Sequence, residues 1–401
     1  MSLEKLPEHI LIQILKHLSY TDVLQVGETC KTLYAASKLE PVWATQCKRI
    51  WLVNKVPEKC ENWVETFKYF YQEFGDTIEC YATIRKIWND LEEYLKENCP
   101  GIFSSLLPGV EKKVLEDFEN LGYHLPKDFK LFYRIHNGQN NNGSGLLGSF
   151  DSEITGVGDV PSRHLLPFEH VRKNWDSINK LSYLTLFEAC EMAQTYFNIM
   201  MELSEENESE PNIFARSYLT MPPIDYKLAN TFTEWIQNYT EKLIDGKFPI
   251  INGQILMFDA NTETSYTSYG ITVSVRWLFH LQLSHNKTHY SYYIKMSMAE
   301  DAPVSNSCQL LTRHWEITDK DGKTENVNGP GVVGQYPIMR PGAVYAWQSA
   351  TSFNTTTGSM KGHFVMALLS DPTRQNTINV ICPEFNMMPW FPTQCGSMGR
   401  E

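Results

Sequence analysis

The sequence has 401 residues, of which 42% are hydrophobic, and a formal net charge of −12 at pH 7. This length allows two or three domains, and the hydrophobic content is that of an ordinary globular protein. The negative charge argues against nucleic acid as the main partner. No apolar run approaches about 18 residues, and the N-terminus shows no signal-peptide pattern. We therefore expect no membrane partner and a location in the nucleus and cytoplasm.

The nine cysteines are scattered and form no Cys-x-x-Cys pair. In a reducing compartment this pattern predicts free, mostly packed thiols rather than disulfides. His124 and His136 have no second ligand at a usual metal spacing, and His285 and His289 flank a predicted hairpin loop. No Gly-x-Ser-x-Gly motif or other nucleophile constellation is present. The sequence therefore predicts no catalytic residue, no metal and no cofactor.

The first 50 residues have the pattern of three or four short helices. Residues 6–18 carry apolar side chains at helical spacing, Pro7 suits a first helical turn, and Thr21 and Asp22 are expected to cap a second helix. Further helices run through residues 30–34 and 42–47. So few short helices cannot bury all this apolar surface among themselves, and the remainder needs another surface.

Leu6-Pro7, the Ile/Leu-rich helix, residues 21–24 and Pro41-Val42-Trp43 together resemble an F-box. This resemblance implies docking on the Skp adaptor of a cullin ubiquitin ligase, and through it to cullin and RING subunits. The alternative is an ordinary helical subdomain that packs on the rest of the chain. The side chains expected to bind the adaptor are Leu6, Pro7, Ile10, Leu11, Ile14, Leu15, Leu18, Val23, Leu24, Val26, Cys30, Leu33, Val42 and Trp43.

Residues 51–100 are expected to form a helical connection. One aromatic stripe runs from Trp63 to Phe74 and a second apolar stripe from Ile84 to Leu95. Pro100 then ends the helix. Aromatic residues at this spacing are far more often core than a cofactor site.

Residues 101–248 carry two helical patterns, then strand-like pieces at 145–150, 183–187, 196–201 and 213–218, then a helix with Phe232, Trp235 and Tyr239. The second helix opens at Leu125-Pro126, and Asn137-Gly138 is expected to close it. The run Leu125-Pro126-x-Asp128-Phe129-x-x-Phe132-Tyr133, followed by His136-Asn137-Gly138, resembles the SUKH superfamily. That resemblance implies an α+β binding module. The segment 151–163 is rich in Gly and Ser and predicts a surface loop.

After a short hinge at 246–251, residues 253–400 are β throughout. Six or seven short strands alternate with turn signals such as Asp321-Gly322, which predicts an antiparallel sandwich. The fold class expected for the whole chain is multidomain α+β: a helical F-box, a central SUKH-like α+β domain and a C-terminal β-sandwich of fibronectin-III-like type.

The runs 308–317, 329–337, 340–345 and 358–362 resemble the ApaG domain. Among them, residues 329–334 spell Gly-x-Gly-x-x-Gly. Dinucleotide binding needs a helix at the end of this motif, whereas Tyr336-Pro337 follows at once, so a structural glycine turn is favoured over a phosphate site. A small anion nest stays open as an alternative. The candidate recognition loop comprises Gly329, Gly331, Gly334 and Tyr336.

Two functions fit these features. The first is an adaptor whose F-box holds the ligase while the other two domains hold a target protein for ubiquitination and degradation. The second is a nucleotide- or pyrophosphate-binding sensor or enzyme built on the ApaG-like domain. We expect the ApaG-like domain to bind protein through exposed aromatic residues, with about half of nine large side chains in its core. The nine are Trp277, Tyr290, Tyr292, Tyr293, Trp315, Tyr336, Tyr345, Trp347 and Phe353.

Overall fold

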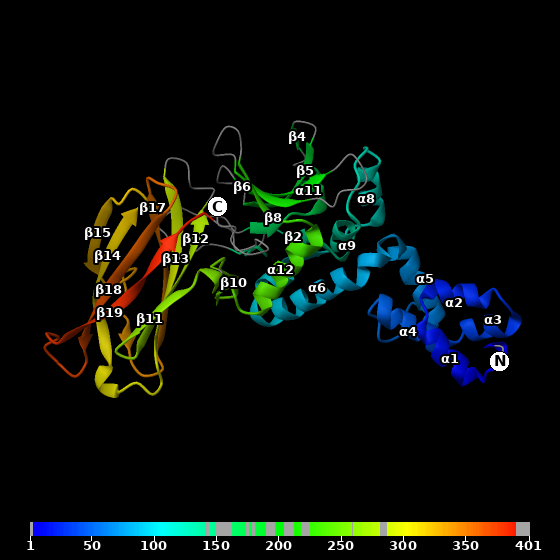
Figure 1. Ribbon diagram of the computed structural model, residues 1–401, viewed down its shortest axis with the longest axis horizontal. Coiled ribbons are helices and arrows are strands. Elements are labelled where there is room, and N and C mark those ends of the chain that lie inside the picture. Colours follow the sequence, from blue (N-terminus) through cyan, green and yellow to red (C-terminus); the bar gives the residue numbers. More distant parts are fainter. Residues whose placement is uncertain are drawn as a thin grey trace. The chain divides into compact units, whose positions relative to one another are not determined.

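The computed structural model describes residues 3–140, 144–148, 163–173, 176–178, 181–189, 197–203, 212–217, 224–258, 260–280 and 287–389 (Figure 1). The chain divides into two compact units. The first comprises Met1–Leu91 and Pro108–Asn137, and the second comprises Glu92–Leu107 and Gly138–Glu401. The division of the sequence into residues 1–50, 51–100, 101–248 and 253–400 stays a prediction.

The first unit is helical. After the short 3-10 turn η1 (Leu3–Lys5), its helices are α1 (Glu8–His17), α2 (Tyr20–Gly27), α3 (Lys31–Ser37), α4 (Glu40–Ile50), α5 (Trp63–Phe74), the first part of α6 (Ile78–Asn98), α8 (Lys112–Glu119) and α9 (Lys127–Ile135). The predicted cap of α2 is wrong. Ser19 caps this helix, because its hydroxyl accepts a hydrogen bond from the Asp22 N–H at 3.1 Å. Thr21 and Asp22 lie inside the helix.

An aromatic cluster joins the first four helices to α5 and α6. The Phe67 ring on α5 lies 4.7 Å from the Trp43 ring on α4, and the Trp51 ring lies 4.9 Å from the Tyr81 ring on α6. Trp43, Trp51, Phe67 and Tyr81 are all buried. Within the predicted stripe of residues 63–74, Phe67 is core, Trp63, Phe70 and Phe74 are half-buried, and Tyr71 is 46% exposed. The cluster around Phe67 holds the N-terminal helices as part of a larger helical unit.

The second unit begins with the last part of α6, continues with α7 (Pro100–Ser105), and contains an antiparallel sheet in the strand order β3-β5-β6-β7-β8, with β4 paired to β5. Its strands are β3 (Arg163–Leu165), β4 (Asp176–Ile178), β5 (Leu181–Ala189), β6 (Phe197–Leu203), β7 (Ile213–Ser217) and β8 (Ile224–Ala229). Helix α11 (Phe168–Lys173) contacts strand β5, and helix α12 (Phe232–Ile244) contacts strand β8. The strands predicted near 183, 196 and 213 are confirmed as β5, β6 and β7.

Two predictions in this region are wrong. Gly145–Gly148 forms a turn rather than a strand, held by the buried Gln139, whose side-chain oxygen accepts the Leu146 N–H at 2.8 Å. Asn137 and Gly138 do not close α9, because the helix ends at Ile135 and both residues lie in strand β2 (His136–Gln139). Residues 149–162, which include nearly all of the predicted Gly/Ser-rich loop, lie outside the described residues.

The predicted hinge at 246–251 is held by ordinary contacts within the second unit. Phe248 is 2% exposed and stacks on Tyr239 with ring centroids 5.8 Å apart. Strand β9 (Ile250–Ile251) pairs with β10 (Gln254–Ile255). The residues that follow α12 are thus packed, and the chain continues into the C-terminal strands without leaving this unit.

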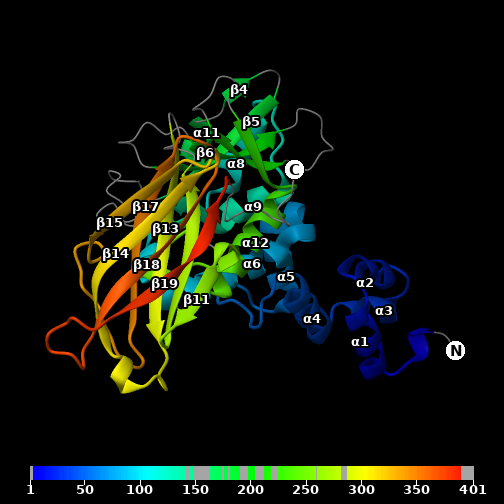
Figure 2. The same cartoon turned by 60° about the vertical axis from the view of Figure 1, so that its left-hand side comes forward.

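The C-terminal residues form two facing antiparallel sheets (Figures 1 and 2). One contains β11 (Thr264–Ser268), β12 (Ile271–His280), β13 (Thr288–Met298) and β17 (Val344–Phe353). The other contains β15 (Thr324–Pro330), β14 (Cys308–Asp319), β18 (Gly358–Leu368) and β19 (Thr377–Met387), with β16 (Ile338–Met339) beside β14. The rings of Trp347 and Phe364 meet between the sheets at 5.5 Å. The predicted sandwich is confirmed, with strands longer than the sequence pattern indicated.

Candidate functional site

The apolar residues of the first helices fall into two groups, one buried inside the helical unit and one at its surface. Helix α1 carries two stripes at a spacing of four residues: Leu11 and Leu15 are buried, whereas Ile10 is 38% exposed and Ile14 is half-buried. Periodicity alone could not tell which stripe points inward, because both repeat at helical spacing. Six of the fourteen predicted adaptor-binding side chains form the interior of the unit: Leu11, Leu15, Val23, Leu33, Val42 and Trp43.

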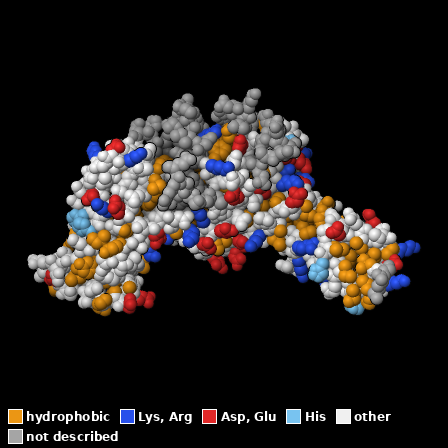
Figure 3. All heavy atoms as spheres, viewed as in Figure 1, with side chains coloured by type: hydrophobic (Ala, Val, Ile, Leu, Met, Phe, Trp, Pro, Cys, Tyr) orange, Lys and Arg blue, Asp and Glu red, His pale blue; other side chains and the backbone are white. Residues whose placement is uncertain are grey.

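The other eight predicted residues keep part of their side chains at the surface: Leu6, Pro7, Ile10, Ile14, Leu18, Leu24, Val26 and Cys30. Leu24 is the most exposed large side chain among them, at 49%. The structure adds Leu3 and Tyr34, which are 38% and 52% exposed and were not among the predicted adaptor-binding residues. Figure 3 shows hydrophobic side chains gathered over the N-terminal helices. We call Leu3, Ile10, Leu24 and Tyr34 the apolar surface of the F-box.

Polar contacts keep the four helices in register beneath this surface. The indole N–H of Trp43 donates to the Ser37 carbonyl at 2.7 Å, and the Gln46 amide donates to the Leu18 carbonyl at 3.0 Å. Gly27 lies against Ser37, where a Cβ would come within 2.6 Å of the Ser37 hydroxyl oxygen. Because these groups are satisfied internally, the exposed apolar side chains rest on a fixed scaffold.

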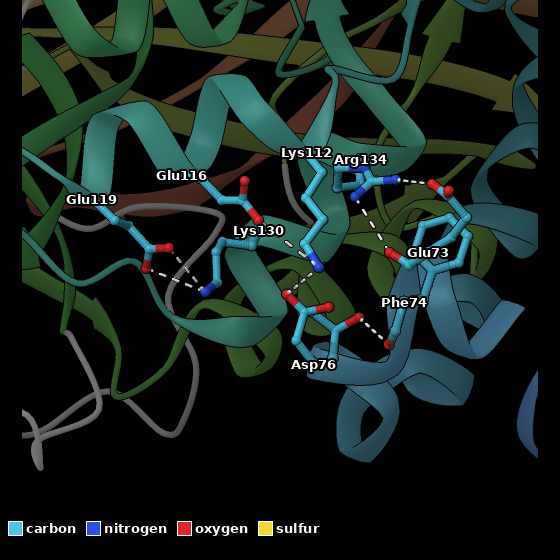
Figure 4. A network of polar contacts seen from close by, with 9 residues as sticks. Glu73, Phe74, Asp76, Lys112, Glu116, Glu119, Lys130 and Arg134 are labelled. Carbon is cyan, nitrogen blue, oxygen red and sulfur yellow. Dashed lines mark hydrogen bonds and ion pairs between the residues drawn. The ribbon is translucent and has the colours of Figure 1, made fainter.

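A network of ion pairs fastens the end of α5 to α8 and α9 within the first unit (Figure 4). Arg134 Nη2 lies 2.9 Å from Glu73 Oε2, and the guanidinium stands 4.9 Å from the Phe74 ring. Lys130 Nζ donates to both carboxylate oxygens of Glu119 at 3.2 Å. The side chain of Arg134 is only 12% exposed, so the Arg134 pair is less screened than an ordinary surface pair.

The glycine motif at 329–334 is a closed turn between strands β15 and β16, and no helix follows it. Val332 and Gln335 exchange backbone hydrogen bonds of 2.9 and 2.8 Å, and the Gly331 N–H donates to the Leu311 carbonyl at 2.9 Å. Arg313 Nη1 donates to the carbonyls of Pro330 and Gly331, both at 2.9 Å. These bonds occupy three of the backbone N–H groups that an anion nest would need, so the geometry favours a structural turn.

Two of the glycines have a steric reason to be there. Gly331 has a φ of +55°, and a Cβ would lie 2.4 Å from the Gln335 carbonyl oxygen. At Gly329 a Cβ would meet the Arg313 guanidinium at 3.0 Å. Gly334 has a φ of +73° and open space around it. Val333 within the turn and Tyr336 and Ile338 after it are 44%, 49% and 45% exposed, so the candidate loop presents apolar side chains rather than a phosphate cradle.

The expectation that about half of the nine aromatic side chains lie outside the core is wrong. Six of them are buried: Trp277, Tyr290, Tyr292, Trp315, Trp347 and Phe353. Tyr293 and Tyr345 are half-buried. Tyr336 alone of the nine is exposed, and Tyr266 and Tyr269 are two further exposed aromatic side chains of this domain.

Burial raises the pKa of five of the described thiols. Burial raises the pKa of Cys47 and of Cys80 to about 12, and that of Cys99 and of Cys308 to about 11. Burial likewise raises the pKa of Cys382. A thiol with a raised pKa is protonated near neutral pH and is a poor nucleophile. These five cysteines are therefore unsuited to carry ubiquitin as a thioester.

Three of the four histidines singled out in the sequence lie among the described residues. The His136 ring packs on the Trp88 ring at 4.5 Å, and His124 is exposed. His289 lies in β13, and His285 lies outside the described residues. Among the residues that the structure describes, no three of His, Cys, Asp and Glu stand close enough to hold a metal ion. None of the described helices combines the length and the apolar character needed to cross a membrane.

Comparison with known proteins matches two segments of the chain to sequence families. The F-box-like family matches residues 3–49, which contain α1–α4. The ApaG domain family matches residues 280–368, which contain the glycine turn. Protein ApaG of Acidithiobacillus ferrooxidans is 38% identical over 98 residues, covering 24% of this chain and 75% of that protein. The SUKH-like character of the central region stays a prediction.

Two relatives match nearly the whole chain. F-box protein SKIP16 of Arabidopsis thaliana is 24% identical over 416 residues, covering 93% of this chain and 95% of that protein. F-box only protein 3 of Homo sapiens is 34% identical over 399 residues, covering 96% of this chain and 83% of that protein. With an F-box-like segment at its start, an ApaG domain near its end and this similarity between them, the chain belongs to the F-box only protein 3 family.

Proposed function

We propose that this protein is the substrate-recognition subunit of a Skp–cullin–F-box E3 ubiquitin ligase. The observation that carries the proposal is the apolar surface of the F-box, which lies on helices held together by the hydrogen bonds of Trp43 and Gln46. The free energy falls when another protein covers such a surface and removes it from water. The Skp adaptor is the partner, and cullin and RING subunits join through it, in the nucleus and cytoplasm.

In this proposal the protein forms no bond itself. It holds a target near the ubiquitin-carrying enzyme and raises the effective concentration of the target's lysines there. The raised pKa values of its buried thiols fit a non-catalytic role. Targets bind through the SUKH-like and ApaG domains. The net charge of −12 disfavours nucleic acid as a partner.

The proposal is tested in cells with a variant that no longer docks. Ile10→Glu combined with Leu24→Glu places two carboxylates on the apolar surface, and their burial against the adaptor without partners is costly. We expect proteins that bind the intact chain to bind this variant too, to lose their ubiquitination and to accumulate. Quantitative mass spectrometry of captured proteins and of ubiquitin-modified peptides measures both effects. Equal ubiquitination of every captured protein with both chains would contradict the proposal.

The nucleotide-sensor alternative has a separate test. Three backbone N–H groups of the glycine turn are already bonded, so calorimetry with ATP or pyrophosphate should show no binding tighter than about millimolar. Micromolar binding of ATP or pyrophosphate that disappears in Gly334→Val would support the nucleotide-sensor function instead. Gly334 suits this test because a side chain there meets open space, although its positive φ makes the substitution strained.

A further inference from the structure

A hollow of about 470 Å³ lies on the outer face of the five-stranded sheet, away from the facing sheet. Strands β15, β14, β18 and β19 all contribute to it. Side chains alternate across a strand. Trp315 and Phe364 point inward and touch Tyr292 and Trp347 of the other sheet, so His314, Glu316 and Lys361 point outward. Neither the adaptor surface nor the glycine turn uses this face.

Two stacked imidazoles form the floor of the hollow. His314 and His363 are cross-strand neighbours, and their rings lie 4.7 Å apart at an angle of 7°. The His314 ring is fixed on both sides, with Nδ1 2.9 Å from Asn328 Oδ1 and Nε2 2.9 Å from Thr312 Oγ1. Burial and the neighbouring His314 lower the pKa of His363. The His363 ring is therefore neutral at neutral pH.

The charged groups around the pair leave a net negative charge. Lys361 Nζ lies 2.9 Å from Glu316 Oε1, and the opposite charges of these two side chains cancel. Glu384 on β19 is exposed and acts on Lys361 only at longer range. With histidines counted as neutral, the two carboxylates and one ammonium of the lining give a formal charge of −1. The exposed carboxylate of Glu384 complements a positive group brought by a partner.

The shape of the hollow selects an extended ligand. Four neighbouring strands span three inter-strand gaps, which is roughly 14 Å at about 4.8 Å per gap. An extended chain covers that distance with about four residues. The lining also offers the amides of Asn326 and Asn328, both exposed, which can hydrogen-bond a peptide backbone.

We propose that this hollow binds an extended segment of a partner protein that places a lysine or arginine beside Glu384. The inference rests on the proposed function, because it locates one recognition surface of the adaptor within the ApaG domain. Acidification opposes binding. Protonation of His363 adds a positive charge to the hollow. A basic segment is therefore held at neutral pH and released as His363 becomes charged.

The test uses the full chain and two fluorescent twelve-residue peptides, one of alternating Thr and Lys and one of alternating Thr and Glu, followed by fluorescence anisotropy. The Lys peptide should bind more tightly than the Glu peptide at pH 7.5. Glu384→Gln should weaken binding of the Lys peptide about two- to five-fold, the range of an exposed ion pair. The matched control is Glu300→Gln, which removes the same charge from an exposed position between β13 and β14. It should leave the affinity within about 1.5-fold of the intact chain, because salt screens distant exposed charges.

The pH dependence of peptide binding separates an effect of the hollow from an effect of the protein's overall charge. Lowering the pH from 7.5 to 5.5 should weaken binding of the Lys peptide, and the double variant His314→Gln/His363→Gln should lose this pH dependence. The proposal fails if Glu384→Gln and Glu300→Gln have equal effects, or if the double variant keeps the full pH dependence. Adaptor binding measured on the same samples tests the proposed function separately, because it depends on the F-box helices alone.

Discussion

Truncation of Ile10 and Leu24 should weaken adaptor binding without weakening the fold. Full burial of such a side chain contributes about 1.5–3 kcal/mol. Ile10 is 38% and Leu24 49% exposed. If a partner covers this exposed area, the burial contributes about 0.6–1.1 kcal/mol at Ile10 and about 0.7–1.5 kcal/mol at Leu24. The double variant Ile10→Ala/Leu24→Ala should therefore lose about 1.3–2.6 kcal/mol of binding free energy, or about ten- to eighty-fold in Kd.

Isothermal titration calorimetry with the purified Skp adaptor measures this loss, and thermal unfolding checks that the variant stays folded. The matched control is Leu121→Ala, which truncates a side chain that is 65% exposed in the loop between α8 and α9. It should leave the Kd unchanged. An unaltered Kd for the double variant, with the adaptor still bound, would refute the assignment of this surface.

Three further predictions concern stability and reactivity. Leu15→Ala should lower the free energy of unfolding by about 2–5 kcal/mol, because this side chain is 1% exposed; a loss of adaptor affinity with unchanged unfolding would contradict its place in the interior. Gly331→Ala should destabilise the C-terminal sandwich by at least about 1 kcal/mol in denaturant unfolding, because the added Cβ meets the Gln335 carbonyl and φ is positive; a variant as stable as the intact chain would show that the turn relaxes freely. Four bonds from Thr373, Gln375 and Asn376 lower the pKa of Asp371 from 3.8 to about 2. The stability that Asp371 contributes is thus complete above about pH 4 and is lost as pH falls toward 2, and a carboxyl NMR titration with a midpoint near 4 would contradict these bonds.

The sequence predicted the helices and the sandwich because their apolar periodicity is strong. It could not decide which of two stripes on α1 faces inward. Ile10-Leu11 and Ile14-Leu15 carry similar side chains at adjacent positions, and only packing against the other helices separates them. The cap at Ser19 was missed for a related reason, since Ser19, Thr21 and Asp22 all have side chains that can cap a helix.

The candidate sites in the C-terminal domain were less predictable. Aromatic residues in alternating strands can face either side of a sheet, and six of nine proved to be core because both sheets turn these positions inward. The hollow over His314 and His363 joins residues about 50 positions apart in the sequence, and their pairing follows from the register of β14 and β18. A single sequence does not show that register.

The central claim is that the F-box helices connect this protein to a ubiquitin ligase. Size-exclusion chromatography with light scattering of the purified chain, Skp adaptor, cullin and RING subunits tests it most directly. The account predicts one complex that contains one copy of each protein and that loses only this chain when the chain carries Ile10→Glu/Leu24→Glu. Elution of the intact, folded chain apart from a complete adaptor–cullin–RING complex would contradict the account.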